Sequence, residues 1–258
     1  MIKIQKNQKY LLFFLFILYF LSRFISYELF QIKADPKVLL PGWHVLELNF
    51  LNTDMFNSIL HLHSQPPLWN IIIGISGKIV DGKIFETAVI LNLYNYILSL
   101  GIIFFSYKTL KILKFKSQFI FLIILLFVVF NPNIIFYENI INYNHSLTFL
   151  FTNLVWLILK FFGTKQKKFE FFIYLNICIQ SLIWAGVHPI ILVFFYITIS
   201  IQKKSFLNYG TIFFAIMFLV SISPMIKNKI IFNKFSNSTW IGINLASTMN
   251  NIDEKMCL

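Results

Sequence analysis

Side chains that donate or accept hydrogen bonds are densest in one short run, His61-Leu-His-Ser-Gln-Pro-Pro-Leu-Trp-Asn70. The imidazole and amide groups of His61, His63 and Gln65 could hold the oxygens of a phosphate group. The two histidines could instead be metal ligands, although no cysteine lies nearby and the acidic residues are distant in sequence. A third interpretation makes them interfacial residues that cap a surface helix. The two prolines favour phosphate binding, because they fix the entry into the next apolar segment and orient the polar side chains before it.

Four acidic residues lie in polar segments and could transfer protons: Asp35, Glu47, Asp54 and Glu138. A carboxylate can act as a general base that takes a proton from an acceptor hydroxyl. Asp35 precedes a proline, which holds its backbone extended, and Glu47 lies in a segment with helix-like apolar spacing. Glu138 would share a helix face with Asn142. The alternatives are solvated loop carboxylates for the first three and, for Glu138, an acid at a helix start stabilised by the helix dipole.

Two further residues could contact a phosphate. Arg23 is the only arginine and lies inside an apolar run, about two helical turns from its end. Such an arginine pairs with a lipid phosphate or a buried acid, or extends its guanidinium to the membrane surface. His188 precedes Pro189 at a break between two later apolar runs, and it is a weaker candidate for the same phosphate.

The composition is typical of a membrane protein. Of 258 residues, 58% are hydrophobic and 12% are charged, whereas a soluble domain is nearer half apolar and a quarter charged. The net charge of +12 comes from lysines in short segments between apolar blocks, a topology signal that argues against nucleic-acid binding. With two cysteines, one inside an apolar block, the chain shows no pattern of a disulfide framework or a zinc knuckle.

The apolar blocks predict a single all-α domain, residues 1–258, built as a polytopic helix bundle, since about 20 residues cross a bilayer core. A first helix that stays attached is expected, because no small-residue cleavage site follows the first block. Seven blocks are predicted to span: Tyr10–Phe30, Ile84–Tyr107, Phe119–Phe136, Ser146–Phe162, Phe171–Val187, Ile190–Ile201 and Tyr209–Met225. A polar connection is expected over Asn131–Asn144.

The lysines orient this bundle. If Leu68–Val80, which is only about 13 residues long, lies along the membrane surface instead of crossing, every lysine-rich segment between the spans falls on the cytoplasmic side. Residues 31–83 then form an external loop with juxtamembrane helices, including a helix-like stretch over Trp43–Leu51. All five histidines fall on the external side in this topology: His44, His61, His63, His145 and His188.

The chain resembles the polytopic GT-C glycosyltransferases, the group of protein O-mannosyltransferases and aminoarabinose transferases. The motif that carries the resemblance is His63-Ser-Gln-Pro-Pro-Leu68, after a first helix and a polar loop, together with Glu138 at the external end of a later helix. The resemblance covers roughly residues 10–245. The usual Asp-Glu pair of the first loop is absent, so the catalytic acid could be Asp35 or Glu47, with Glu138 as the second acid. Family members carry further helices, so we expect this chain to be an amino-terminal fragment.

The resemblance implies transfer of a sugar from a polyprenyl-phosphate donor to a lipid, glycan or protein acceptor at the external face of a bacterial-type inner membrane. The carboxylate would activate the acceptor hydroxyl for inverting attack. The leaving phosphate would be steadied by His61, His63, Gln65, Arg23 and His188. No cofactor is implied, although a divalent metal ion would be compatible with the chemistry.

The rival interpretation is a transporter, or a subunit that binds or scrambles lipids. Transporters place ionisable residues near the membrane centre, often at broken helices, and often show repeated halves. Here the polar residues are expected outside the bilayer and no internal repeat is visible. The sequence therefore favours the enzyme.

Overall fold

The computed structural model describes residues 2–39, 45–114, 118–206 and 209–238. These residues form helices, with no strand among them. The bounds are α1 (Ile2–Phe30), η1 (Pro36–Leu39), α2 (Leu48–Thr53), α3 (Met55–His61), α4 (Leu68–Ile79), α5 (Ile84–Ile112), α6 (Gln118–Val129), α7 (Pro132–Asn139), α8 (Asn144–Thr164), α9 (Lys167–Ile183), α10 (Ile190–Lys203) and α11 (Tyr209–Phe232). The all-α prediction is confirmed for this part of the chain.

Five helical segments are long and apolar enough to cross a membrane: Tyr10–Phe30, Ile84–Ile112, Phe119–Asn139, Asn144–Thr164 and Tyr209–Phe232. By length and composition the chain is therefore a multi-pass membrane protein. Helices α9 and α10 have 17 and 14 residues. They occupy the positions of the other two predicted spans, and a seven-span bundle stays a prediction.

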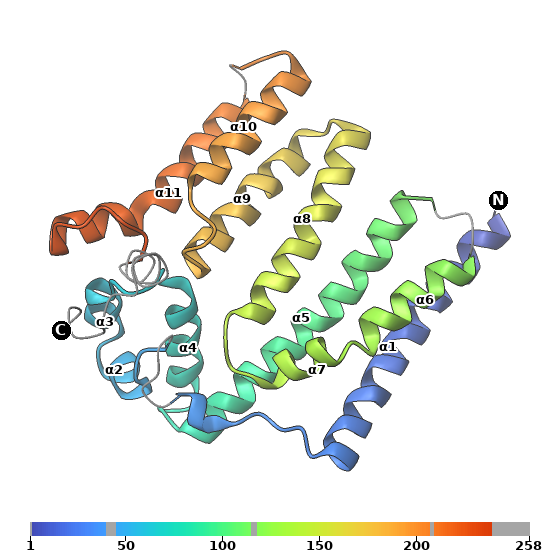
Figure 1. Ribbon diagram of the computed structural model, residues 1–258, viewed down its shortest axis with the longest axis horizontal. Helices are drawn as coiled ribbons and strands as arrows, with labels where there is room; N and C mark the ends of the chain where they lie inside the picture. The colour runs from blue at the N-terminus through green and yellow to red at the C-terminus, as the bar shows by residue number, and fades with distance from the viewer. Residues whose placement is uncertain (1, 40–44, 115–117, 207–208, 239–258) are drawn as a thin grey trace, which may run out of the picture.

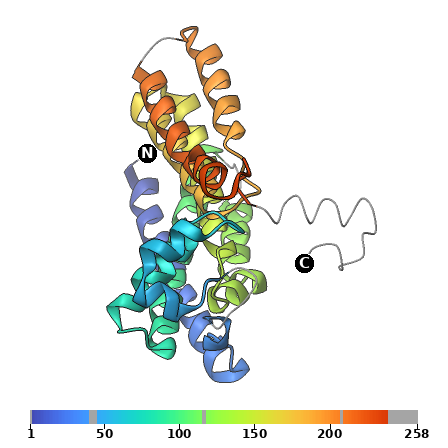
Figure 2. The ribbon, with the colours of Figure 1, turned by 90° about the vertical axis from the view of Figure 1, so that its left-hand side faces the viewer.

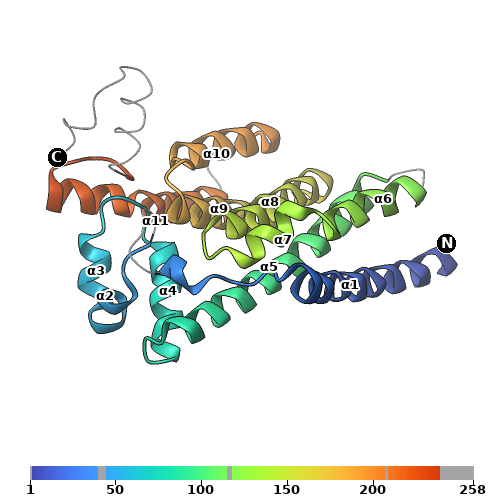
Figure 3. The ribbon, with the colours of Figure 1, turned by 60° about the horizontal axis from the view of Figure 1, so that its bottom comes forward.

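The long helices lie side by side and alternate in direction (Figure 1). One end of the bundle, here called the lysine end, holds Lys114 after α5, Lys165 after α8 and Lys204 after α10, together with the start of α1. The opposite end, here called the loop end, holds η1, α2, α3 and α4, which stand in front of the long helices in Figure 2. We call these four elements the loop-end module. Figure 3 shows it at the end opposite the start of α1.

Helix α4 belongs to this module and does not run along the bundle. It has 12 residues, a length of about 18 Å. Trp69 and Ile73 are buried against α2 and α5, while Leu68 packs on the start of α8 and the end of α9. The start of α4 therefore lies where the sequence predicts it, beside the helix ends nearest to Glu138 and His188. Its depth in a membrane stays a prediction.

Two glycines let the module pack tightly. A Cβ atom at Gly74 would lie 2.8 Å from Sδ of Met55, and one at Gly77 would lie 2.6 Å from Cδ1 of Leu48. Both distances are shorter than real Cβ contacts. A larger residue at either position would therefore have to displace the end of the Met55 or Leu48 side chain.

The predicted helix Phe119–Phe136 is broken. Helix α6 ends at Val129 and α7 begins at Pro132. Pro132 has no backbone N–H, and the side chain of Asn131 accepts a hydrogen bond from the Asn133 N–H at 2.9 Å, which caps the new helix. The predicted polar connection Asn131–Asn144 is therefore wrong over Pro132–Asn139, because Asn131 starts a helix instead of a loop.

Candidate functional site

Most of the polar residues that the sequence singled out lie in two groups, one at the loop end and one between the long helices. At the loop end, His61 and His63 line one cavity of about 280 Å³ at the end of α3. Ser58 and Ser64 supply its hydroxyl groups, and Phe50 forms part of its apolar wall. Both imidazoles are exposed to solvent. The structure thus brings together the two histidines that the sequence singled out.

Lys227 of α11 joins this cavity to the last long helix. Its ammonium donates hydrogen bonds to the carbonyl of Ile59, at 3.3 Å, and to the carbonyl of Leu62. These carbonyls lie at the end of α3, where the Ile59 carbonyl also accepts a hydrogen bond from the Leu62 N–H at 3.3 Å. The rings of His63 and Phe232 lie 4.8 Å apart. The end of α11 therefore fixes the turn that carries the histidines.

Sequence reasoning missed Lys227. A signal was present, since a lysine in the last apolar block at the loop end opposes the lysine distribution of the other segments. Gln65 lies half-buried between this turn and the start of α4, and Pro66 behind it is buried. Both residues belong to the connection that orients the histidine side chains.

The first-loop acids occupy the same module. Asp35 is exposed, and its carboxylate accepts a hydrogen bond from the Lys37 N–H at 2.9 Å, which opens η1. Glu47 is partly exposed in front of α2 and accepts a hydrogen bond from the amide of Asn49 at 3.1 Å. Each carboxylate keeps lone pairs for another donor. Both can therefore accept a proton from an incoming hydroxyl.

Asn70 holds the segment before Glu47 in place. Its side-chain oxygen, buried in the first turn of α4, accepts a hydrogen bond from the Leu46 N–H at 2.8 Å. Glu47 is thereby tied to the helix that follows the histidine turn. The predicted helix-like stretch begins later than expected, at Leu48, and Trp43 and His44 lie outside the described residues.

Asp54 serves the local fold. Its carboxylate accepts hydrogen bonds from the backbone N–H of Asn57 at 3.2 Å and from the side-chain amide of Asn57 at 2.6 Å. These bonds cap α3 and hold the pKa of Asp54 below its ordinary value, because they stabilise the charged form.

The second cluster lies between the long helices and is centred on Arg23 and Glu138. The guanidinium donates two hydrogen bonds to the carboxylate, each 2.6 Å long. Glu138 is completely buried and Arg23 is 8% exposed. Ser99 of α5 donates to the same carboxylate, and its hydroxyl lies 2.8 Å from Nε2 of His145. We call these four residues the buried network.

The buried network also supplies a hydrogen-bond donor for a carbonyl that the break in the α6–α7 segment leaves without its helical partner. In an unbroken helix the Val129 carbonyl would accept from the N–H of Asn133, which here bonds to Asn131. Arg23 donates to this carbonyl instead, at 2.6 Å. The network therefore joins α1 to both halves of the broken segment.

Arg23 thus has a buried acid as its partner, one of the interpretations that its sequence position left open. Both oxygens of Glu138 accept bonds from protein groups, and neither side chain reaches a cavity at the loop end. We infer that the two residues position the helices in this arrangement. The proposed substrate site does not include them.

Asn92 and Asn95 complete this cluster. Their side-chain amides donate to the backbone carbonyl of Glu138, at 2.9 and 3.1 Å. Sequence reasoning missed both residues and Ser99. The available signal was their spacing by three and four residues, which places three polar side chains on one face of an apolar helix.

His188 lies apart from both clusters, in the turn between α9 and α10. It is exposed, and its Nδ1 accepts a hydrogen bond from the Ile190 N–H at 3.3 Å. Its position at the start of α10 makes it a helix cap on the loop-end side of the bundle.

Across the described ranges, no three side chains of histidine, cysteine or acid type are grouped as a metal site would require. No family model matches this chain, and no curated protein and no solved structure matches it. The function must therefore be argued from the two clusters themselves.

Proposed function

We propose that the chain is a membrane glycosyltransferase of the GT-C type, which transfers a sugar from a polyprenyl-phosphate donor to an acceptor at the loop end. The observation that carries the proposal is one cavity lined by His61 and His63, on the same small module as two accessible carboxylates. This module stands at the end of the bundle away from the lysine end. The lysine distribution supports an external position for the module.

In the proposed reaction the carboxylate of Asp35 or Glu47 takes the proton of the acceptor hydroxyl. The hydroxyl oxygen forms a bond to the anomeric carbon, and the bond from that carbon to the donor phosphate breaks. Polyprenyl phosphate leaves with the electron pair. His61 and His63 would donate hydrogen bonds to its oxygens, with Gln65 beside them. His188 stays a weaker candidate for the same role.

The proposal is supported by the two kinds of surface that a lipid-linked donor needs. The donor's lipid tail needs the apolar surface of the long helices, while its phosphate needs hydrogen-bond donors at their ends. The turn that carries the histidines meets both conditions, because it packs between the start of α4 and the end of α11. The acceptor would enter from the solvent side, past Asp35 and Glu47.

Sugar transfer from a radiolabelled polyprenyl-phosphate donor, in reconstituted membranes, tests the proposal. We expect either Asp35→Asn or Glu47→Gln to lower turnover by a factor on the order of 10²–10⁴, the usual contribution of a general base. The other variant should be nearly silent. Asp54→Asn is the matched control, because it changes a third acid of the same module and should keep activity. Full activity in both of the first two variants would refute the assignment.

His63→Ala should act differently. It should raise the donor concentration needed for half-maximal rate more than it lowers the maximal rate, since the interaction lost is with bound donor phosphate. His188→Ala tests the weaker candidate and should have a smaller effect. If both histidine variants had equal effects, the cavity at the end of α3 would not be the donor site.

Sidedness is tested separately with cysteines placed at Lys83 and Lys114, in a chain whose Cys257 is replaced by serine. Cys178 is buried and should not react. A membrane-impermeant thiol reagent should label the two positions from opposite sides of sealed vesicles. Labelling from the same side would remove the external placement of the module.

A second candidate function, a transporter, is favoured by one observation. The ion pair between Arg23 and Glu138 lies at a broken helix, where transporters often hold ionisable groups. Proteoliposomes loaded with a pH-sensitive dye separate the candidates. Proton flux that Glu138→Gln abolishes would favour transport, whereas donor turnover without flux would favour the transferase.

A further inference from the structure

A groove between α8 and α9 has features that neither polar cluster explains. Its volume is about 530 Å³, within the usual range of sites for small organic ligands. It extends along α9 from Lys168 to Ile179, a distance of about 16 Å. Phe105, Trp156 and Phe169 form an aromatic wall, with ring centroids 5.1 and 5.9 Å apart in successive pairs.

Two polar atoms in the wall of this groove are unsatisfied. Oδ1 of Asn153 and Nε1 of Trp156 are buried and have no hydrogen-bond partner within the ranges that the structure describes. Buried polar groups are normally paired. An occupant that brings its own donors and acceptors into the groove would satisfy them.

Lys168 gives the groove a charged end. Its ammonium lies 5.3 Å from the centre of the Phe169 ring, which is part of the aromatic wall. The neighbouring lysines are engaged elsewhere: Lys165 donates to Gln202 at 3.1 Å, and Lys167 lies over the ring of Tyr209 at 4.6 Å. Only Lys168 of these three lines the groove.

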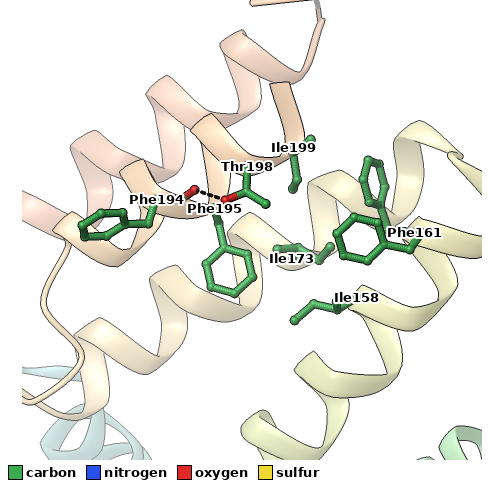
Figure 4. Close-up of a pocket in the computed structure, with 8 residues that line it drawn as sticks. Ile158, Phe161, Ile173, Phe194, Phe195, Thr198 and Ile199 are labelled. Carbon is green, nitrogen blue, oxygen red and sulfur yellow. Dashed lines mark hydrogen bonds between the residues drawn. The ribbon is translucent and has the colours of Figure 1, made fainter. Parts of the chain in front are cut away.

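A second gap shows what an ordinary packing defect looks like in this protein. Figure 4 shows a cavity of about 180 Å³ where α8 and α9 meet α10, with Phe161, Phe195 and Ile199 in its wall. Its one side-chain hydroxyl, of Thr198, donates to the Phe194 carbonyl at 2.8 Å. No lysine is part of its wall, although the Lys165 ammonium lies over the rings of Phe161 and Phe162 at 5.5 and 5.0 Å. The larger groove differs from it in both respects.

We propose that the groove binds an anionic phospholipid of the leaflet at the lysine end. One acyl chain lies along Leu175 and Ile179, and the headgroup phosphate lies at Lys168. The ester region of the lipid is placed to accept a hydrogen bond from Trp156. We assign a lipid to the groove because the groove pairs an extended apolar wall with a cation at one end only. This inference requires a membrane-spanning chain and does not depend on sugar transfer.

Fluorescence quenching by phospholipids with brominated acyl chains tests the proposal. The probe is the Trp156 signal in reconstituted vesicles, taken as the difference between the native chain and Trp156→Phe. Brominated phosphatidylglycerol should quench this signal at a mole fraction about fivefold lower than brominated phosphatidylcholine, the preference expected from one lysine near an anionic lipid.

Lys168→Gln should abolish the preference, while Lys167→Gln, which removes the same charge one residue away, should keep it. Leu175→Phe should reduce quenching by both lipids, because the larger ring fills the groove. Equal quenching by the two lipids in the native chain would overturn the charge assignment. A difference signal that neither lipid quenches would overturn lipid binding, and so would exclusion of both lipids by a second copy of the chain.

Discussion

The loop-end module and the buried network hold similar kinds of side chain and use them in opposite ways. In the network, Arg23, Glu138, Ser99 and His145 satisfy one another and are closed to solvent. In the module, Asp35 and Glu47 accept local hydrogen bonds and the two histidines line a cavity, and all four side chains stay accessible. The contrast shows that an ionisable side chain in a helix bundle can position helices or meet a substrate, and its remaining hydrogen-bonding capacity tells which.

The largest expected effect comes from breaking the network. Glu138→Ala leaves a buried guanidinium without its counter-charge, and breaking such a pair costs about 3–5 kcal/mol. Unfolding in mixed micelles with increasing denaturing detergent should show this loss. The double variant Arg23→Met with Glu138→Leu should recover much of it, because a pair of apolar side chains removes both desolvated charges.

If Glu138→Ala alone unfolded like the native chain, the network would not hold the helices together. The comparison with Asp35→Asn sharpens this contrast. An exposed acid with one local hydrogen bond should change the free energy of unfolding by less than about 0.5 kcal/mol, even if it abolishes turnover.

An intermediate effect is expected at Lys227, which joins α11 to the end of α3. Lys227→Met keeps the length of the side chain and removes the ammonium that donates to the carbonyls of Ile59 and Leu62. Loss of hydrogen bonds from a charged group should cost about 1.5–3 kcal/mol. Hydrogen exchange at the end of α3 should speed up, while exchange in α8 should not change. Equal acceleration in both helices would indicate global unfolding instead.

The smallest effect is expected at Asp54 and depends on pH. Because the pKa of this carboxyl is lowered in the folded chain, its stabilisation of α3 is complete above the pKa of an unfolded aspartate. It is lost as the pH falls through the lower, folded value. Hydrogen exchange at Asn57 should therefore accelerate in acid. Asp54→Asn should keep a cap and lose this pH dependence, and unchanged acid sensitivity in that variant would contradict the assignment.

The long helices could be predicted because their signal is local. An apolar run of sufficient length is a helix whatever its neighbours, and the first predicted span, Tyr10–Phe30, lies within α1 and ends at the same residue as that helix. The break before Pro132 could also have been predicted, since an asparagine followed by proline is a frequent helix start. The five asparagines of residues 131–144 suggested a loop instead.

The partners in each cluster could not be predicted. Arg23 and Glu138 are separated by 115 residues, and Lys227 and Leu62 by 165. No periodicity in one helix specifies which acid another helix presents. The sequence identified Arg23 as a residue that costs free energy to bury in a membrane. It identified Glu138 as an acid at the end of a helix. Only the packing of α1 against the broken segment shows that each is the other's partner.

The bonds from Lys227 to α3 also set an order of events during synthesis. The histidine turn is translated early, but the residue that fixes it follows 165 positions later. At about 5–20 residues per second, roughly 8–30 s pass between them. Through that interval the nascent chain holds the histidine turn without the bonds that fix it. A ribosome that stalled before Lys227 would therefore leave the first helices in place beside an unassembled site.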